Sequence, residues 1–290
     1  MKTLIILSLI AGILGRNMLV TKEYVELLKK SVSWEVEEYE NNIFRDWSVE
    51  EAKSLLGLKS LEMDESIPEV ETKEMPPAEM SWRGAGCDHG PKDQGDCGSC
   101  WAFAAVGMLS DRCCIGGRDH GWLSPQELVS CDKQDFACDG GYLDKPLNYI
   151  VNKGGLVPDA CFPYVAKKVN CPTKCADGSA WATAHTCQCQ GKQACTGTKG
   201  IKACLANGPV SIGFMVCQSF MSYKSGIYKC DCTNYLGGHA VLVMGYATSP
   251  VCHYTVKNSW GTTWGDNGYF KIACTTCKLQ GGYVCSKVVG

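Results

Sequence analysis

The chain has 290 residues, of which 45% are apolar and 20% are charged, and its formal net charge at pH 7 is −2. This balance is typical of a globular protein and argues against a disordered chain, a collagen-like chain or a protein with several membrane spans. The small net charge gives no reason to expect binding to nucleic acid. Cysteine is the exception, because all 21 cysteines lie from Cys87 onward and predict a disulfide scaffold made in an oxidising compartment.

Residues 1–15 have the features of a secretory signal peptide. Met1-Lys2 is a basic start, Leu4–Leu14 is an apolar run, and Gly15 is a small residue suited to cleavage. The run is too short to cross a membrane, and no later segment is long and apolar enough for a span. We therefore expect a protein of the secretory pathway, lysosomal, vacuolar or extracellular, without a membrane span. A buried amphipathic helix is the alternative for this segment.

Residues 16–78, called the leader below, differ in composition from residues 79–290, called the body. The leader has no cysteine and a net charge of −7, whereas the body has a net charge of +4. Two units with different roles are therefore expected. We interpret the leader as a removable pro-segment whose hold on the body weakens when acid protonates its carboxylates. An N-terminal helical subdomain is the alternative.

The leader contains two predicted helices followed by a linker. Apolar residues at helical spacing predict one face of a first helix, formed by Tyr24, Leu27, Leu28 and Val32. Ser48–Glu51 has the pattern of a capping box and predicts a second helix that ends at Gly57. The polar and proline-bearing residues 59–80 predict an exposed linker.

The first chemical motif of the body is Gln94-Gly-Asp-Cys-Gly-Ser-Cys-Trp101. An apolar stretch follows that is suited to a buried helix, and Cys100 would lie at its N-terminus, where the helix dipole favours a thiolate. The motif resembles that of the papain family of cysteine proteases, in which the second cysteine is the nucleophile. A cytosolic Cys-x-x-Cys would instead suggest redox or zinc chemistry.

Two later residues complete the resemblance. His239 follows Gly238 at the start of an apolar run that reads as a strand, 139 residues after Cys100, and Asn258 lies in an Asn-Ser-Trp-Gly element. The resemblance implies that Cys100 attacks the scissile carbonyl, that His239 protonates the leaving amine and that Asn258 orients the imidazole. It also implies that the Gln94 side chain stabilises the oxyanion.

The resemblance further implies a set of substrate-binding residues. Gly140 and Gly141 would pair with the substrate backbone, although Asp139 replaces the usual asparagine before them. The remaining implied contacts are Gly238, Trp260 as a shield of the catalytic pair, Trp264 on the primed side, and Lys287 at the bottom of the second subsite, where it would weaken any preference for arginine.

Removing Cys100 from the 21 cysteines leaves twenty, enough for ten disulfides and one free thiol. The resemblance implies four of these pairs, which are Cys97–Cys138, Cys131–Cys171, Cys161–Cys175 and Cys87–Cys114. The closely spaced cysteines near 187, 230 and 274 could also be read as half zinc sites, but we favour disulfides and expect no metal or cofactor.

Within the family, the likeness is to cathepsin B. The implied fold is α+β and papain-like, with a helical left lobe at about 81–190, a β-barrel-like right lobe at about 191–290 and a short helical pro-segment. Only Val165–Val169 stands where cathepsin B has an occluding loop with paired histidines, so the loop is expected to be absent. This predicts an endopeptidase with little dipeptidyl-carboxypeptidase activity.

The implied partners are protein and peptide substrates, the enzyme's own pro-segment and cystatin-like inhibitors, and the chain is expected to be a monomer. Three other functions were weighed. A silent papain-like binding protein would commonly lack the nucleophile, and a disulfide-rich adhesion or toxin scaffold would not explain the ordered trio. A thiol oxidoreductase would need Cys97 to cycle, whereas a protease would need it locked in a disulfide.

Overall fold

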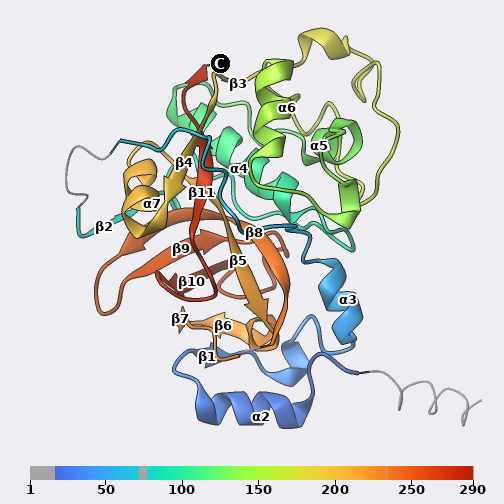
Figure 1. Ribbon diagram of the computed structural model, residues 1–290. Helices are drawn as coiled ribbons and strands as arrows, with labels where there is room; N and C mark the ends of the chain where they lie inside the picture. The colour runs from blue at the N-terminus through green and yellow to red at the C-terminus, as the bar shows by residue number, and fades with distance from the viewer. Residues whose placement is uncertain (1–16, 72–76, 233, 290) are drawn as a thin grey trace, which may run out of the picture.

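The computed structural model describes residues 17–71, 77–232 and 234–289. The predicted signal peptide, residues 1–15, therefore lies outside the described residues. Within them, no helix is both long enough and apolar enough to cross a membrane. Two lobes of different composition meet along the strand β8, and the leader lies against both of them (Figure 1).

The left lobe is built on one long helix, α4 (Cys100–Ile115). Fourteen of its residues are buried, including the whole stretch from Cys100 to Cys113, as its apolar sequence predicted. Two shorter helices pack against it, α5 (Pro125–Cys131) and α6 (Lys145–Lys153). Short 3-10 turns at Ala137–Asp139 and Trp181–Thr183 complete this lobe.

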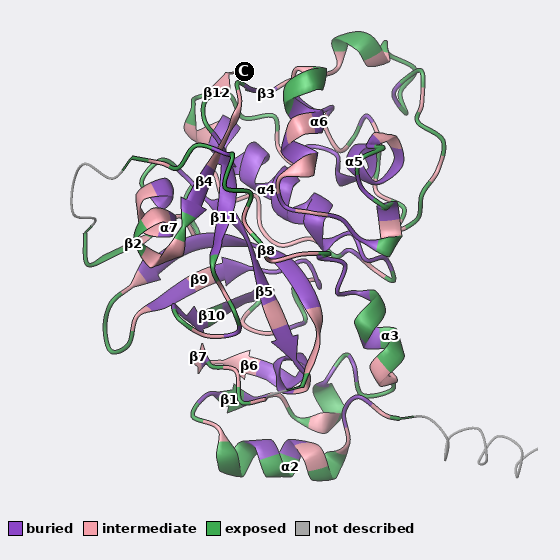
Figure 2. Ribbon diagram, viewed as in Figure 1, coloured by how far each residue is buried: buried purple, intermediate pink, exposed green. Residues whose placement is uncertain are grey.

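The right lobe is an eight-stranded sheet. Seven of its strands follow the order β4-β11-β5-β8-β9-β10-β7, and the eighth, β2, pairs with β8. The helix α7 (Gly197–Leu205) packs on this sheet, and the strand interiors are buried (Figure 2). The strands of this sheet are β2 (Glu79–Ser81), β4 (Lys192–Thr196), β5 (Val210–Cys217), β7 (Ile227–Tyr228), β8 (Tyr235–Ala247), β9 (His253–Lys257), β10 (Tyr269–Ala273) and β11 (Gly281–Cys285). A separate pair is formed by β3 (Gln188–Cys189) and β12 (Val288–Val289).

The leader forms α2 (Lys22–Ser31), β1 (Glu35–Val36), a 3-10 turn (Tyr39–Asn41) and α3 (Val49–Ser54). It docks on the right lobe where β1 pairs with β6 (Tyr223–Ser225), next to the 3-10 turn Gln218–Ser222. Trp34 of the leader packs against the rings of Tyr223 and Tyr228, with centroid distances of 5.9 and 5.3 Å.

Of two predictions about the leader helices, one is confirmed and one is wrong at a single position. The capping box at Ser48 is present, with reciprocal hydrogen bonds between Ser48 and Glu51. The predicted face of α2 is wrong in one position, because Leu27 is 61% exposed whereas Val25 is buried. The spacing also fitted Leu27, but the right lobe lies on the side of Val25 and Leu28.

Ten disulfides join twenty of the 21 cysteines, all of which are described, and Cys100 is the free one. The four pairs implied by the resemblance are all present. The six other pairs are Cys113–Cys187, Cys189–Cys285, Cys195–Cys204, Cys217–Cys232, Cys230–Cys277 and Cys252–Cys274.

Candidate active site

Cys100 lies at the first residue of α4 and is completely buried, as is His239 on β8. The backbone amide of Ala240, the residue after His239, donates to the Cys100 Sγ at 3.5 Å. This contact places the predicted nucleophile and the predicted base side by side, one from each lobe. The other four histidines make hydrogen bonds elsewhere, with Asp111 and Asp119, Thr186, Glu127 and the carbonyl of Val251.

Asn258 holds the His239 ring in one orientation. Its Oδ1 accepts a hydrogen bond from His239 Nε2 at 2.7 Å, which leaves Nδ1 as the nitrogen available for proton transfer. Trp260 stacks on the imidazole, with ring centroids 4.7 Å apart. Asn258 and Trp260 therefore occupy the positions that their predicted roles require.

Gln94 is buried and anchored by a residue that the sequence analysis did not single out. The Ser259 hydroxyl donates a hydrogen bond to Gln94 Oε1 at 2.6 Å. In return, the backbone N–H of Gln94 donates to the Ser259 carbonyl at 2.8 Å. Ser259 lies inside the Asn-Ser-Trp-Gly element, so the motif itself carried the signal. The Gln94 side-chain NH₂ group donates to the Leu55 carbonyl of the leader at 3.0 Å.

The leader runs directly through this site. Gly141 donates its backbone N–H to Gly57 at 2.8 Å and accepts from Lys59 at 2.9 Å. Leu58 donates to the Gly238 carbonyl at 3.1 Å, so the leader backbone bonds to both lobes. Gly141 and Gly238 thus bind the extended backbone of the leader.

Gly57 lies closest to the nucleophile helix. A Cβ atom built on Gly57 would lie 1.9 Å from the carbonyl oxygen of Gly98, and one built on Gly140 would lie 2.3 Å from the Gly57 oxygen. Gly140 also has a φ of +109°, in the left-handed region that glycine tolerates. The sequence predicts a helix that ends at Gly57, but α3 ends at Ser54, and it is this close approach that requires a glycine at position 57.

Burial changes the ionisation of the catalytic candidates. Loss of water raises the pKa of the Cys100 thiol to about 11, although backbone amides that include those of Ala240 and Gly57 oppose the shift. Loss of water also lowers the pKa of His239 to about 4, against the effect of its bond to Asn258. With the leader in place, burial therefore disfavours the thiolate–imidazolium form of the pair.

One predicted contact, Lys287, is not brought to the cleft. Lys287 lies two residues beyond β11, near the paired residues Cys285 and Lys192, and lines a separate hollow with Arg112. The opposite end of β11 faces β5, where Gly282 pairs with Ile212. Lys287 therefore lies beyond the far end of β11 from this pairing, in the separate hollow and not at the cleft.

Trp264 is buried against rings of its own lobe, which are Phe220, Tyr223, Trp260 and Phe270. Trp260 also meets the leader, because Phe44 contacts its ring edge-on at 5.4 Å. The contact predicted for Trp264 on the primed side stays a prediction, and its ring packs edge-on against Trp260 at 5.0 Å.

Gly213 is a further cleft residue that the sequence analysis missed. A Cβ atom on Gly213 would lie 2.4 Å from Leu58 and 2.7 Å from Leu61 of the leader, so the missing side chain makes room for both leucines. Leu143 closes the same space from the left lobe. A glycine inside a strand can mark the close approach of another group, but the sequence alone does not identify that group as the leader.

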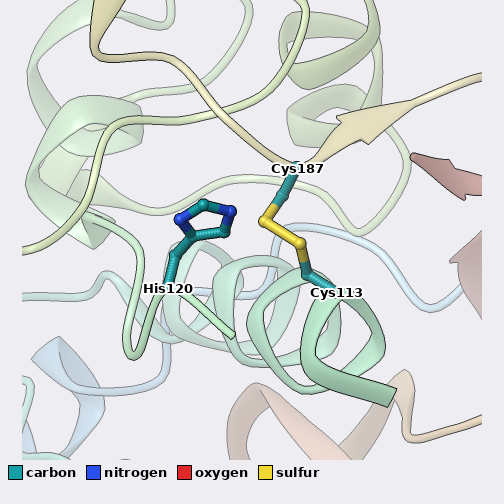
Figure 3. A group of neighbouring side chains, drawn as sticks. All are labelled: Cys113, His120 and Cys187. Carbon is teal, nitrogen blue, oxygen red and sulfur yellow. A yellow bond between two sulfur atoms is a disulfide. The ribbon is translucent and has the colours of Figure 1, made fainter. Parts of the chain in front are cut away.

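The cysteine groups that might have held a metal are oxidised. One such grouping is Cys113, Cys187 and His120, and Figure 3 shows the two sulfurs joined in a disulfide beside the imidazole. Disulfide sulfurs cannot act as thiolate ligands. Cys97 is bonded to Cys138 and not to Cys100, which is the locked state that a protease needs and a thiol oxidoreductase does not.

Comparison with known proteins agrees with this geometry. Residues 76–286 match the papain family cysteine protease domain. The chain belongs to the papain family of cysteine proteases. The predicted family and the predicted α+β papain-like fold are therefore confirmed.

Two curated relatives from Giardia intestinalis, cathepsin B-like CP3 and CP2, are 41% and 40% identical over 188 residues, which is 62% of this chain. The same region spans 62% of each relative, less than two thirds of its length. Among solved structures, procathepsin B S9 from Trypanosoma congolense matches with a TM-score of 0.79 and 26% identity, over 92% of this chain and 99% of that one. Procathepsin L2 from Tenebrio molitor matches with a TM-score of 0.75 and 28% identity, over 90% and 88% of the two chains.

The close approach of Gly57 leads to a first prediction. Gly57→Ala should push the leader out of the cleft, because the added Cβ would collide with the Gly98 carbonyl. The Cys100 thiol, buried in the native chain, should then react at least tenfold faster with a neutral alkylating reagent at pH 7. Since Cys100 is the only free thiol, mass mapping reports it directly. Ser60→Ala is the control, and equal reactivity of the two variants would contradict the prediction.

Asp135 lies directly behind Gly141 and leads to a second prediction. Its Oδ1 accepts from the Tyr142 backbone N–H at 2.8 Å, and burial, aided by the charge of neighbouring Asp132, raises its pKa to about 8. The folded state therefore retains a proton that the unfolded chain loses near pH 4, so this carboxyl lowers stability progressively from about pH 4 to pH 8.

Asp135→Asn should remove that loss, because the amide oxygen can still accept from Tyr142. The difference in free energy of unfolding between the variant and the native chain should rise in favour of the variant from pH 4 to pH 8 and then level off. Denaturant unfolding at four or five pH values measures it. Exposed Asp139→Asn is the control, and a difference that does not change with pH would rule the assignment out.

Proposed function

We propose that this protein is a cysteine endopeptidase made as a secreted, latent precursor, in which residues 16–78 are the inhibitory pro-segment and residues 79–290 are the peptidase domain. The observation that carries the proposal is the leader backbone, which lies between Gly141 and Gly238 while its Leu55 carbonyl accepts from Gln94. A chain held in this way blocks the site that a substrate needs. The similarity to procathepsins over about nine tenths of the chain supports the same assignment.

The proposed mechanism begins once the leader has left and water has returned to the cleft. Cys100 then transfers its proton to His239 and, as a thiolate, attacks the scissile carbonyl. Gln94 donates a hydrogen bond to the oxygen as negative charge develops on it. His239 protonates the leaving amine, and water then hydrolyses the acyl-enzyme with His239 as the base. Asn258 keeps the ring oriented through its Oδ1.

The proposed specificity is for a bulky apolar residue in the pocket beside Gly141. The leader places Leu58 there, and Gly213 leaves the wall open for a second leucine. Lys287 lies in a separate hollow and does not reach this pocket, so its charge does not act against arginine there. Protein and peptide substrates, inhibition by cystatin-like proteins, a lysosomal, vacuolar or extracellular location, activity at acidic pH and a monomeric state remain part of the proposal.

The experiment that tests the function is acid treatment followed by labelling with a thiol-directed epoxysuccinyl peptide. We expect one label, on Cys100, that a peptide substrate blocks and that Cys100→Ala abolishes. Gln94→Ala should fold but lose on the order of 10²–10³ in kcat on a blocked peptide, because one oxyanion donor is lost. Exposed Gln134→Ala is the matched control. A folded protein that takes no label would overturn the proposal in favour of a disulfide scaffold.

The short segment Val165–Val169 leads to the prediction on exopeptidase activity. Val165 donates its N–H to Gln126 and Val169 donates to Ser130, both on α5, so the segment is held on the left lobe. It contains no histidine to receive a substrate carboxylate. The test uses a peptide whose chain ends two residues after the scissile bond, once with a free C-terminal carboxylate and once with a C-terminal amide. We expect the two forms to differ less than twofold in kcat/KM. A strong preference for the free acid would show the prediction to be wrong.

A further inference from the structure

Beyond the cleft, the leader lies on the edge of the right-lobe sheet. Ala194 of β4 donates its N–H to the Pro68 carbonyl at 2.9 Å and accepts from the Val70 N–H at 3.0 Å, so the leader pairs with β4 in parallel through Glu69. β4 is the end strand of the sheet on this side. The leader therefore completes the sheet edge, where Figure 1 shows it passing over β4 and β11.

Side chains hold the same segment at three further points. The Tyr283 hydroxyl accepts from the Asp64 N–H at 2.6 Å, and Ile67 is only 4% exposed. Met63 reaches Gly281, where a Cβ atom would lie 3.2 Å from the Met63 methyl carbon. A groove of about 590 Å³ lies between this part of the leader and the sheet, lined on the body side by Ala194, Thr196 and Gln280.

The charges of the two sides are complementary. Residues 59–70 carry four carboxylates and one lysine. Hydrogen bonds from Ser66 and the charge of Lys192 lower the pKa of Asp64. Farther along, Arg112 and Lys287 line a hollow together with Val70 of the leader. Arg112 is buried and donates to backbone carbonyls, and Lys192 is paired with Asp144 at 3.2 Å. The exposed Lys287 is therefore the basic side chain of this hollow that can meet an acidic flank.

We propose that, in the matured enzyme, the β4 edge is an exosite for the acidic N-terminal flank of an extended protein substrate. The proposal rests on the proposed function. Both polar backbone groups of Ala194 point away from β11, so departure of the leader leaves them unpaired on an edge strand, which is the situation that strand addition relieves. The edge is continuous with the cleft, because the leader passes from Leu58 to Glu69 along one surface.

The identity of the flank follows from the two sides of the cleft. Trp260 and Phe44 lie on the primed side, and β4 lies on the other side of Gly141. The part of a substrate that reaches β4 is therefore the part before the scissile bond. An edge strand accepts a chain in either direction, so a substrate need not copy the parallel direction of the leader.

The experiment compares three peptides that share one scissile sequence, using the acid-activated protein. One has four residues before the scissile bond, one adds a flank of twelve residues with four carboxylates and a central isoleucine, and one has the same flank with glutamine in place of each carboxylate. We expect kcat/KM to be about tenfold higher for the acidic flank than for the short peptide, the gain expected of two backbone hydrogen bonds.

Ala194→Pro should abolish this gain and leave the short peptide unaffected, because the lost N–H faces outward and proline is tolerated on that side of an edge strand. Ala194→Ser keeps the N–H and should keep the gain. Lys287→Gln is a second variant, and it leaves β4 intact. It should reduce the gain in kcat/KM of the acidic-flank peptide severalfold and leave kcat/KM of the glutamine-flank peptide unchanged.

Each result is decisive. Failure to cleave any of the three peptides would overturn the proposed function and this inference with it. Equal kcat/KM for the short and the acidic-flank peptides would overturn the inference alone. A gain that survives in both Ala194→Pro and Lys287→Gln would exclude β4 as the binding edge.

Discussion

The structure depends on one contact between backbones, where the Gly57 peptide lies between Gly98 and Gly140. Neither side can carry a side chain there, since Cβ atoms at Gly57 and Gly140 would approach oxygen atoms to 1.9 and 2.3 Å. The wall that Gly57 meets is itself held by the Cys97–Cys138 disulfide and by the Gly98 N–H bond to Cys138. Covalent bonding in the body thus fixes the width of the slot into which the leader fits.

This close fit also decides the chemistry of the site. With the leader seated, Cys100 and His239 lose their water, and the ionic form of the pair is the form that desolvation penalises. The imidazole is already oriented by Asn258 and covered by Trp260, so no catalytic side chain has to be rebuilt when the cleft opens. The difference between the two states is mainly the return of water to a site that is preorganised.

Local patterns in the sequence predicted what local interactions determine. The capping box at Ser48 depends on residues three apart, and the apolar run after Cys100 favours a helix buried on most sides. The pattern could not show whether Val25 or Leu27 faces the right lobe, because both fit an amphipathic helix and only the partner surface decides. The error at Lys287 has a similar origin. Register on β11 is set by its pairing with β5 and β4, and no motif near the C-terminus marks that register.

The contacts between leader and body also bear on how acid would release the leader. Among described residues, one ion pair joins the two, between Glu35 and Lys224 at 3.4 Å. A hydrogen bond from Ser225, together with Lys224, lowers the pKa of Glu35, so this contact is lost only as pH falls below the usual carboxylate range.

The remaining contacts between leader and body are largely backbone hydrogen bonds at Gly141, Gly238 and Ala194 and buried apolar side chains, none of which titrates. Acid therefore weakens a small part of the contact and the long-range attraction between opposite net charges, which salt screens over about 10 Å. Once the leader is cut, its two parts no longer bind as one chain, so we argue that proteolysis, more than protonation, makes release irreversible.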